Sequence, residues 1–297
     1  MKKASTVSKA VVRRNRRTAY LFLLPNIIGF AIFTLVPVVW SIYLGFTKWN
    51  GVTTPKFVGL KNYFDIFSSS DFIIALKNTV IYTVGTVPVI IVLALIIAFV
   101  LERDVKGATA VRAAFFFPHI SSIVAISCVW QLIYAKNGLI NGFLRSIGIA
   151  NPPAWLSSAT WALPAVMIMI IWKGIGYYMI IYLAGLRGVD GALYEAATID
   201  GCNAVQRFWH ITIPSLRPVT FYITTICIIN SFQVFTPVYI MTQGGPGRAT
   251  TVMVLQIYND AFKNYEFGRA SAEAMILFLA ILVVTLVQFQ HNKKQNA

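Results

Sequence analysis

Acidic residues are scarce in this chain of 297 residues, which holds 10 Asp and Glu against 25 Lys and Arg. Charged residues make up only 12% of the chain and hydrophobic residues 57%. Soluble domains carry about 25% charged and about 45–50% apolar residues, so the composition predicts an integral membrane protein. The formal net charge of +15 would indicate a nucleic-acid partner for a soluble protein. Here the bases lie mainly between apolar runs and at the chain ends, so topology explains them better and no nucleic acid is expected.

Sequence motifs of the common enzyme classes are missing as well. A Gly-Lys pair occurs nowhere, so there is no phosphate-binding loop of the Walker type and we do not expect the chain to hydrolyse ATP by itself. The three histidines and three cysteines show no metal-ligand spacing. No nucleophile elbow, paired carboxylate motif or dinucleotide glycine pattern appears. We therefore expect no enzyme, no metal and no cofactor of its own.

What the chain does contain is apolar runs of membrane length. About 20 apolar residues cross a ~30 Å hydrocarbon core as a helix, and lipid cannot satisfy open backbone groups, so each run should be helical. The sequence predicts an all-α protein with six transmembrane helices, at 19–46, 79–101, 113–135, 159–183, 218–241 and 271–290. This domain, 19–290, would follow a basic tail at 1–18 and precede a short tail at 291–297.

Basic residues between the runs predict the orientation. Most of the 25 Lys and Arg fall on the side shared by both ends of the chain and the loop 184–217. Because cytoplasmic segments carry the excess of Lys and Arg, we expect both termini and this loop to be cytoplasmic. On the other side, helical spacing in 251–262 predicts a short interfacial helix, preceded by a turn at 244–247.

Polar groups inside the predicted spans are candidates for a solute path. Asn230 and Gln233 share one helical face of the fifth run, where they could bond to other helices or pair with a polar solute between aromatic walls. The candidates for the path are Asn230, Gln233, Tyr177, Tyr178, Trp130 and Gln131. For Lys173 and Glu273 a structural or interfacial role is favoured, because each could lie near an outer boundary or extend to it.

The loop 184–217 is the one long polar stretch flanked closely on both sides by membrane-length runs. Asp190 is placed to cap a short helix, which Gly201 would end with a positive φ. Asn203 reads as a second cap, with Gln206 in capping-box position, until Pro214 prevents continuation. We expect two short helices at an angle on the cytoplasmic surface.

These two helices have two possible roles. Small Ala196 and Ala197 would allow another protein to approach closely, and Glu195 would offer it a hydrogen-bond acceptor. The alternative is an ordinary amphipathic loop that rests on lipid headgroups. The residues alone do not separate these two.

The spacing of Glu195-Ala196-Ala197, Gly201, Ile211 and Pro214 resembles the signature of the inner-membrane permease family of binding-protein-dependent ABC importers. Ile213 stands where that family usually shows leucine. The resemblance implies a type I ABC importer permease fold and a loop that docks in a groove of a separate ATPase subunit. The residues implied in this ATPase coupling are Glu195, Ala196, Ala197, Asp200, Gly201, Ile211 and Pro214, with Glu195 as the polar anchor.

Further short matches, each weak alone, follow in order along nearly the whole chain: Leu24-Pro25, Phe46-Thr47, Trp49-Asn50, Gly59-Leu60, Asn62-Tyr63, Asn78-Thr79, Met241–Pro246, Tyr258, Ala261-Phe262 and Gly268. Together they resemble the first-permease subunit of sugar importers of the maltose and glycerol-3-phosphate type. This implies a cell-membrane heterodimer with a second permease, two ABC ATPase subunits that bind the ATP, an extracytoplasmic solute-binding protein, and a carbohydrate as solute.

Three other functions stay open. The solute could be glycerol phosphate or another polyol, carried by a permease of the same family. An ion-coupled secondary carrier would work without an ATPase, but the shortage of acidic residues in the spans argues against it. A membrane scaffold or receptor would carry no solute at all. The residues do not identify the sugar.

Overall fold

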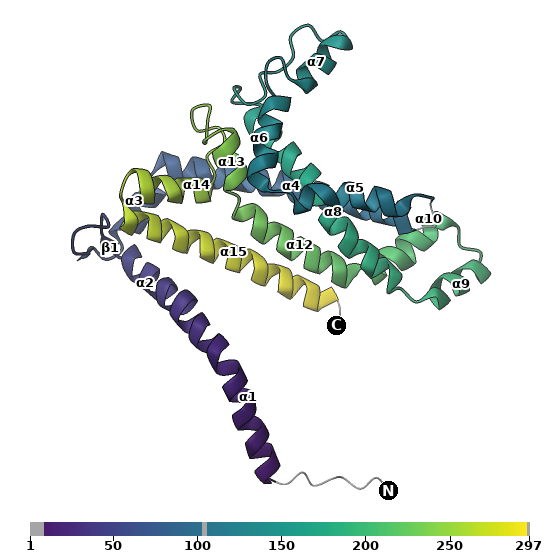
Figure 1. The fold of residues 1–297 in the computed structure, drawn as a ribbon, viewed down its shortest axis with the longest axis horizontal. Helices are drawn as coiled ribbons and strands as arrows, with labels where there is room; N and C mark the ends of the chain where they lie inside the picture. The colour runs from purple at the N-terminus through teal and green to yellow at the C-terminus, as the bar shows by residue number, and fades with distance from the viewer. Residues whose placement is uncertain (1–8, 103–105, 296–297) are drawn as a thin grey trace.

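The computed structural model describes residues 9–102 and 106–295. Its secondary structure is helical apart from one short two-stranded hairpin, so the all-α prediction is confirmed. The body is a bundle in which α4 (Ser70–Glu102) contacts α8 (Ala162–Arg187) and α12 (Arg217–Phe232). The last helix, α15 (Phe267–Gln295), packs against α12 and runs from the end with the hairpin towards the end with the loop 184–217 (Figure 1).

Four helical segments are long and apolar enough to cross a membrane: Tyr20–Gly45, Ser70–Glu102, Ala162–Arg187 and Phe267–Lys293. Two bent pairs also qualify, Ala108–Ile120 with Ile123–Ile133 at 100° and Ala204–Ser215 with Arg217–Phe232 at 64°. If each pair is one span, the described residues hold up to six spans, the number that was predicted.

Two of the predicted spans are not continuous helices. The run 113–135 divides into α5 (Ala108–Ile120) and α6 (Ile123–Ile133), with extended backbone at Ser121 and Pro118 in the last turn before it. The run 218–241 divides into α12, which ends at Phe232, and α13 (Thr236–Met241). Proline in the first turn of α13 suits a helix start, so the expectation of unbroken helices here is wrong.

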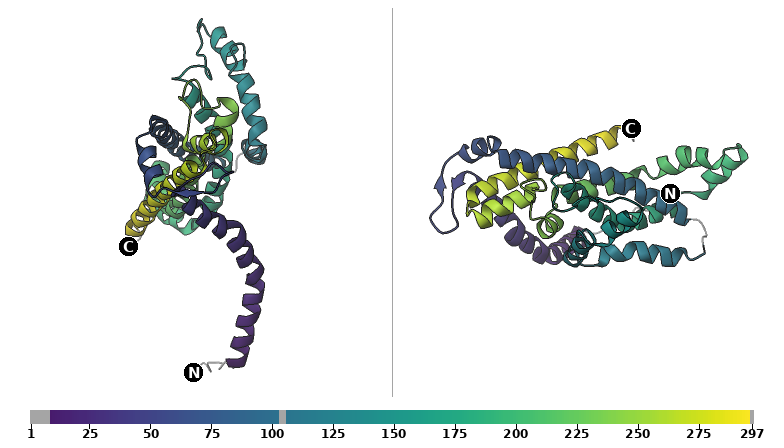
Figure 2. Two further views of the ribbon diagram at one scale, coloured as in Figure 1. Left: turned by 90° about the vertical axis from the view of Figure 1, so that its left-hand side faces the viewer. Right: turned by 90° about the horizontal axis from the view of Figure 1, so that it is seen from above.

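The amino-terminal helix leaves the bundle. It consists of α1 (Lys9–Phe30), a π-helical turn (Ala31–Leu35) and α2 (Val36–Gly45), and it curves away from the other helices in two views (Figures 1 and 2). Its most apolar 18-residue window has a mean hydropathy of 2.2 and buries no side chain against the rest of the described chain. The helix already begins at Lys9, so the second half of the predicted tail 1–18 is helical. Residues 1–8 and 296–297 of the two predicted tails lie outside the described residues.

A small cap closes the end of the bundle that lies opposite the loop 184–217. The strands β1 (Thr47–Lys48) and β2 (Lys56–Phe57) pair antiparallel and lead into α3 (Lys61–Phe67). The side-chain amide of Asn62 donates to the carbonyls of Gly45 at 2.9 Å and Thr47 at 2.8 Å. These bonds satisfy carbonyls at the carboxyl end of α2 and fix the hairpin to it.

The predicted helix 251–262 is present as α14 (Met253–Tyr258) and a π-helical turn, Asn259–Lys263. It does not rest only on an interface, because Met253 and Leu255 are fully buried and α14 packs on α4 and α15. The turn predicted at 244–247 is confirmed by positive φ at Gly244 and Gly247.

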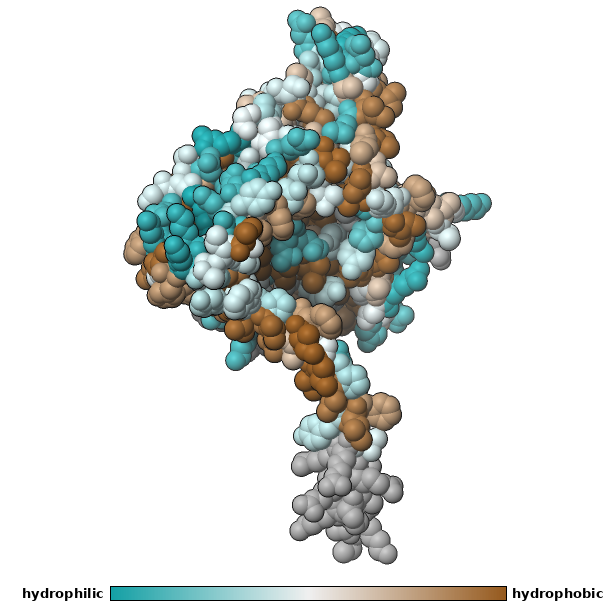
Figure 3. Space-filling view, turned by 60° about the vertical axis from the view of Figure 1, so that its left-hand side comes forward, coloured by the Kyte–Doolittle hydropathy of each residue, from teal (hydrophilic) through white to brown (hydrophobic). Residues whose placement is uncertain are grey.

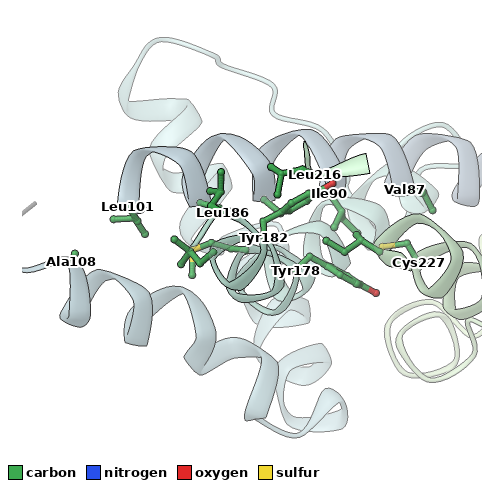
Figure 4. Packing of buried hydrophobic residues seen from close by; sticks show 14 residues of the cluster. Val87, Ile90, Leu101, Ala108, Tyr178, Tyr182, Leu186, Leu216 and Cys227 are labelled. Atoms are coloured by element: carbon green, nitrogen blue, oxygen red, sulfur yellow. The ribbon is translucent and has the colours of Figure 1, made fainter. Parts of the chain in front are cut away.

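The core between α4, α8 and α12 depends on close helix approach. Ala94 and Ala98 of α4 are fully buried, and Met179 and Tyr182 of α8 fill the space beside them. Figure 4 shows Tyr178, Tyr182 and Leu216 converging in this cluster. A β-carbon at Gly176 would lie 1.8 Å from the carbonyl oxygen of Phe115, so only glycine lets α8 meet α5 there. Small residues at such contacts are typical of membrane helices.

One buried ion cluster fixes the start of α15. Arg269 Nε lies 3.0 Å from Asp260 Oδ2 and 3.5 Å from Glu273 Oε1, and Glu273 is fully buried. Asp260 also accepts from Gln256 Nε2 at 3.1 Å and Asn264 Nδ2 at 2.8 Å. The structural role favoured for Glu273 agrees with this position inside the protein.

We expect Arg269→Met to destabilise the protein strongly, because two buried carboxylates would share a site without a counter-charge. Breaking a buried ion pair from one side costs about 3–5 kcal/mol. The measurement is thermal unfolding of the purified membrane complex. The control is Glu266→Gln, since Glu266 is half exposed and 4.0 Å from Arg269 Nε. Equal midpoints for the two variants would contradict this role of the cluster.

Candidate functional site

Two places in the fold hold the residues that the sequence singled out. One is the loop between α8 and α12, which projects from one end of the bundle as α9 (Gly191–Ile199) and α10 (Ala204–Arg207) (Figure 1). The other is a cavity between α4, α8 and the break after α12.

The first helix of the loop begins and ends as predicted. The Asp190 side chain accepts a hydrogen bond from the Ala192 N–H at 2.9 Å and caps α9. Gly201 follows the helix with a φ of +78°, a conformation that side-chain-bearing residues rarely adopt. The Cys202 N–H then bonds to the Ala197 carbonyl at 2.9 Å, which closes the end of the helix.

The second helix begins at the predicted capping box and runs past its predicted end. Asn203 Oδ1 accepts from the Gln206 N–H at 2.9 Å, and Gln206 Oε1 accepts from the Asn203 N–H at 2.8 Å. The chain stays helical through a π-helical turn, Phe208–Thr212, and α11 (Ile213–Ser215), so the prediction that Pro214 stops it is wrong. Pro214 lies in the first turn after the wider π turn, where its missing N–H is tolerated.

Two side-chain contacts hold the helices of the loop at their angle. The hydroxyls of Tyr194 and the fully buried Thr212 lie 2.8 Å apart. Arg207 Nη1 donates to Thr198 Oγ1 at 2.9 Å. These two side-chain bonds therefore give the loop a defined shape.

The structure places the predicted coupling residues on different sides of this loop. Glu195, Ala196, Asp200 and Gly201 are exposed, whereas Ala197 is buried within the chain. Ala197 therefore supports the packing of α9 within the chain. Ile211 and Pro214 are half-buried on the second helical segment.

Three large apolar side chains of the loop are exposed, and Val205 and Trp209 belong to the helical face that the sequence predicts. The exposed fractions are 86% for Ile199, 65% for Val205 and 61% for Trp209. Tyr194, Glu195, Thr198, Ile199 and Arg207 together line a shallow depression. An exposed Ile199 beside the charges of Glu195 and Arg207 suits a protein-binding surface.

The second place is a cavity of about 320 Å³ among the helices. Its described wall comes from α4, α5, α6, α8, α12 and the segment up to Pro237: Tyr82, Thr86, Ile90, His119, Ile123, Ile170, Lys173, Gly174, Tyr178, Cys227, Asn230, Ser231, Gln233, Val234, Phe235, Thr236 and Pro237. Figure 3 shows a hollow on one face of the molecule, in which hydrophilic and hydrophobic residues lie side by side.

Three of the six predicted path residues line the cavity, namely Asn230, Gln233 and Tyr178. Asn230 and Gln233 face it because α12 ends at Phe232, just where the chain turns away. Two hydroxyls also line it, those of Ser231 and of Thr86, which the sequence did not single out, and their oxygens are 3.5 Å apart.

The other three path candidates lie outside the cavity wall. Gln131 Nε2 donates to the Ile240 carbonyl at 2.8 Å and so joins α6 to α13. Trp130 packs against Trp172, with ring centroids 5.5 Å apart. Tyr177 stacks on His119 at 4.3 Å, behind the side chain that lines the cavity.

Lys173 lies in the wall of the cavity, on α8, and is only 9% exposed. Its ammonium group donates to the carbonyls of Pro118 at 2.8 Å, His119 at 2.8 Å and Ser121 at 3.1 Å. These three carbonyls belong to the end of α5 and the break after it. The residue is therefore deep in the bundle rather than at an outer boundary.

Comparison with known proteins gives a consistent result. Residues 67–296 match the family described as "Binding-protein-dependent transport system inner membrane component". The chain is 35% identical over 283 residues to the probable ABC transporter permease protein YesP of Bacillus subtilis, covering 94% of this chain and 91% of YesP. It is 35% identical over 298 residues to the lactose transport system permease protein LacF of Rhizobium radiobacter, covering 99% and 100%.

A solved structure shares the fold over nearly the whole chain. It is the crystal structure of a bacterial ABC transporter involved in the import of the acidic polysaccharide alginate. The TM-score is 0.82 at 26% identity, with 95% of this chain and 96% of that chain covered.

We expect Asn203→Ala to loosen the second helix of the loop, because it removes the capping box. Such a change costs about 1 kcal/mol of local stability, or roughly a fivefold change in an opening equilibrium. Amide hydrogen exchange at Gln206 and Arg207 should accelerate by that factor. Asn203→Asp keeps the acceptor and should leave exchange near the wild-type rate. Unchanged exchange in the alanine variant would contradict the capping role.

Proposed function

Because the chain belongs to the family of binding-protein-dependent transport system inner membrane components, we propose that it is the membrane-spanning permease subunit of an ATP-driven carbohydrate importer. The observation that carries the proposal is the family match over residues 67–296, on a chain with up to six membrane-length spans and a cavity whose wall includes amides and hydroxyls. The carbohydrate is supported by relatives whose names refer to lactose and alginate. The family consists of transport components rather than enzymes.

The proposed assembly contains a second permease, two ABC ATPase subunits and an extracytoplasmic solute-binding protein. The binding protein is supported by the family description itself. The ATPases, not this chain, would bind the ATP. The described residues include no group of three or more His, Cys, Asp or Glu suited to a metal ion, and no cofactor of the chain's own is proposed.

The loop of α9 and α10 is the proposed docking site for one ATPase. Ile199, Val205 and Trp209 would supply apolar contact, and Glu195 would accept hydrogen bonds from the ATPase. Ala196 would allow close approach, while Asp200, Gly201, Ile211 and Pro214 would shape the loop. The contacts of Tyr194 with Thr212 and of Arg207 with Thr198 would preserve the shape of the loop when the ATPase moves against it.

The same proposal assigns a side to each end of the bundle. The ATPase lies in the cytoplasm, so the loop and both termini would be cytoplasmic, in agreement with the excess of basic residues there. The cap formed by β1, β2, α3 and α14 would then face the binding protein outside the cell.

Transport would alternate between outward and inward openings of the cavity. ATP states that bind one conformation better than the other must provide the energy, since a ligand shifts an equilibrium only by its differential affinity. The exposed side chains of Asn230 and Gln233 would supply amide groups that pair with sugar hydroxyls. An ion-coupled carrier is less well supported, because none of the described residues that line the cavity is Asp or Glu.

The test is ATPase activity and uptake by the complete complex in proteoliposomes, with its binding protein and a panel of saccharides. We expect at least one saccharide to stimulate ATPase activity and to accumulate inside. Uptake by the purified chain alone, driven by an ion gradient, would instead establish a secondary carrier. No flux with all partners present would leave a scaffold or receptor.

We expect Glu195→Lys to abolish coupling, because it replaces an exposed acceptor with a positive charge at the docking surface. Uptake should fall by at least about tenfold, the effect of losing a charge-assisted contact, while expression and membrane insertion persist. ATPase co-purification and uptake are the measurements. Glu102→Lys is the control, an exposed residue at the end of α4 with the same charge change. Normal uptake in Glu195→Lys would remove this residue from the coupling surface.

We expect Asn230→Ala to weaken solute binding in the cavity. Losing one hydrogen bond of about 1 kcal/mol should raise the half-saturating solute concentration roughly fivefold. The matched variant is Gln131→Ala, which alters a similar amide that lies outside the cavity wall. It should leave that concentration unchanged. If the two variants behaved alike, the cavity would not be the path.

A further inference from the structure

The one lysine in the cavity wall has no hydrogen to offer a solute. An ammonium group carries three N–H donors, and Lys173 Nζ has three acceptors within 3.1 Å, the carbonyls of Pro118, His119 and Ser121. The side chain is 9% exposed, so little of it is left to face the cavity. Its position on the wall alone would predict an anion site, but its hydrogen bonds do not.

The carbonyls that bind Lys173 have a physical need for it. The last carbonyls of any helix lack an intrahelical partner, and α5 ends at Ile120, before a 100° bend. The negative end of the helix dipole adds to the attraction for a cation. In a membrane no bulk water can replace the missing partners. The charge of Lys173 is therefore used to stabilise the bend between α5 and α6.

The rest of the described wall is nearly free of charge. His119 is the one other basic side chain among the lining residues that the structure describes, and its ring is stacked on Tyr177. The remaining polar side chains of the described wall are neutral: Tyr82, Thr86, Tyr178, Cys227, Asn230, Ser231, Gln233 and Thr236. Such groups can replace the water around sugar hydroxyls. They do not compensate the loss of hydration of a carboxylate or phosphate, which is far larger.

On the basis of the proposed function, we propose that Lys173 is a positioning residue that pins the α5–α6 bend. It follows that this chain's cavity selects uncharged, hydroxyl-rich solutes over uronates and sugar phosphates. A structural neighbour is involved in the import of an acidic polysaccharide. We do not expect this chain to carry an acidic solute of that kind. The polyol phosphate alternative is excluded by the same argument.

The first test compares solutes in the complete wild-type complex. Uptake and ATPase stimulation are measured with lactose and maltotriose as neutral probes and with digalacturonate and glycerol 3-phosphate as anionic probes. We expect a preference of at least about tenfold for a neutral probe. A preference for an anionic probe would overturn the inference while leaving the importer function intact. Failure of every probe with all partners present would overturn the proposed function and this inference with it.

The second test separates positioning from recognition with variants of Lys173. Lys173→Met should lower the maximal uptake of the neutral probe by about tenfold or more, with the half-saturating concentration and the neutral preference unchanged. Lys173→Arg, which retains N–H donors, should restore part of the rate. Lys136→Gln is the control, since Lys136 is exposed on the segment after α6.

A local measurement completes the test if the methionine variant transports nothing. Amide exchange at Ile126, whose N–H donates to the Ser122 carbonyl at 3.0 Å, should accelerate in Lys173→Met, while exchange in α9 stays unchanged. Unaltered exchange at α6, or a methionine variant that loses affinity for anionic probes alone, would show that Lys173 recognises solute and does not pin the bend.

Discussion

Backbone groups that are freed inside a membrane must find partners within the protein, and this structure depends on how they do so. Two apolar segments break within the bundle, after Ile120 and after Phe232. At the first break Lys173 binds three carbonyls, and Gln131 binds the carbonyls of Ile240 and Met241 at the carboxyl end of α13. Each of these polar side chains thus satisfies backbone groups at the end of a helix. The cavity lies where the helices divide, and Lys173 compensates the carbonyls at the break after Ile120.

The loop outside the membrane was largely predictable, because its signals are local. A cap such as Asp190 or Asn203 acts on amides two or three residues away, and a glycine such as Gly201 acts through its own φ. The residues that make such interactions are close together in the sequence. The number of spans followed for a similar reason, since hydropathy is a sum over neighbouring residues. Family membership agreed with the resemblance that the loop spacing carried.

The breaks and the cavity wall were not predictable in the same way. The segment around Ser121 is flanked by apolar residues, so its average hydropathy resembles that of a continuous span, and the partner that permits the break lies 52 residues away. Gln131 and Asn230 have similar side chains in similar surroundings in the sequence. One binds a neighbouring helix and the other faces a cavity, and only the packing of α12 and α13 separates them. Pro214 shows a related limit, because a π turn before it absorbs the missing N–H.

The amino-terminal helix has a consequence for how the protein is made. Between Tyr20 and Gly45 its buried residues are Leu44 and Gly45, at the junction with the rest of the chain. Within the described chain α2 packs against α15, whereas the most apolar 18-residue window of the helix buries none of its residues. Lipid tails can cover its leucines, isoleucines and phenylalanines as well as another subunit can. In a newly synthesised copy, lipid can therefore cover this helix before any other subunit binds. On a soluble protein the same apolar surface would be exposed to water. The subunits then meet by diffusion in the plane of the bilayer, while lipid keeps the apolar surface of this helix out of water.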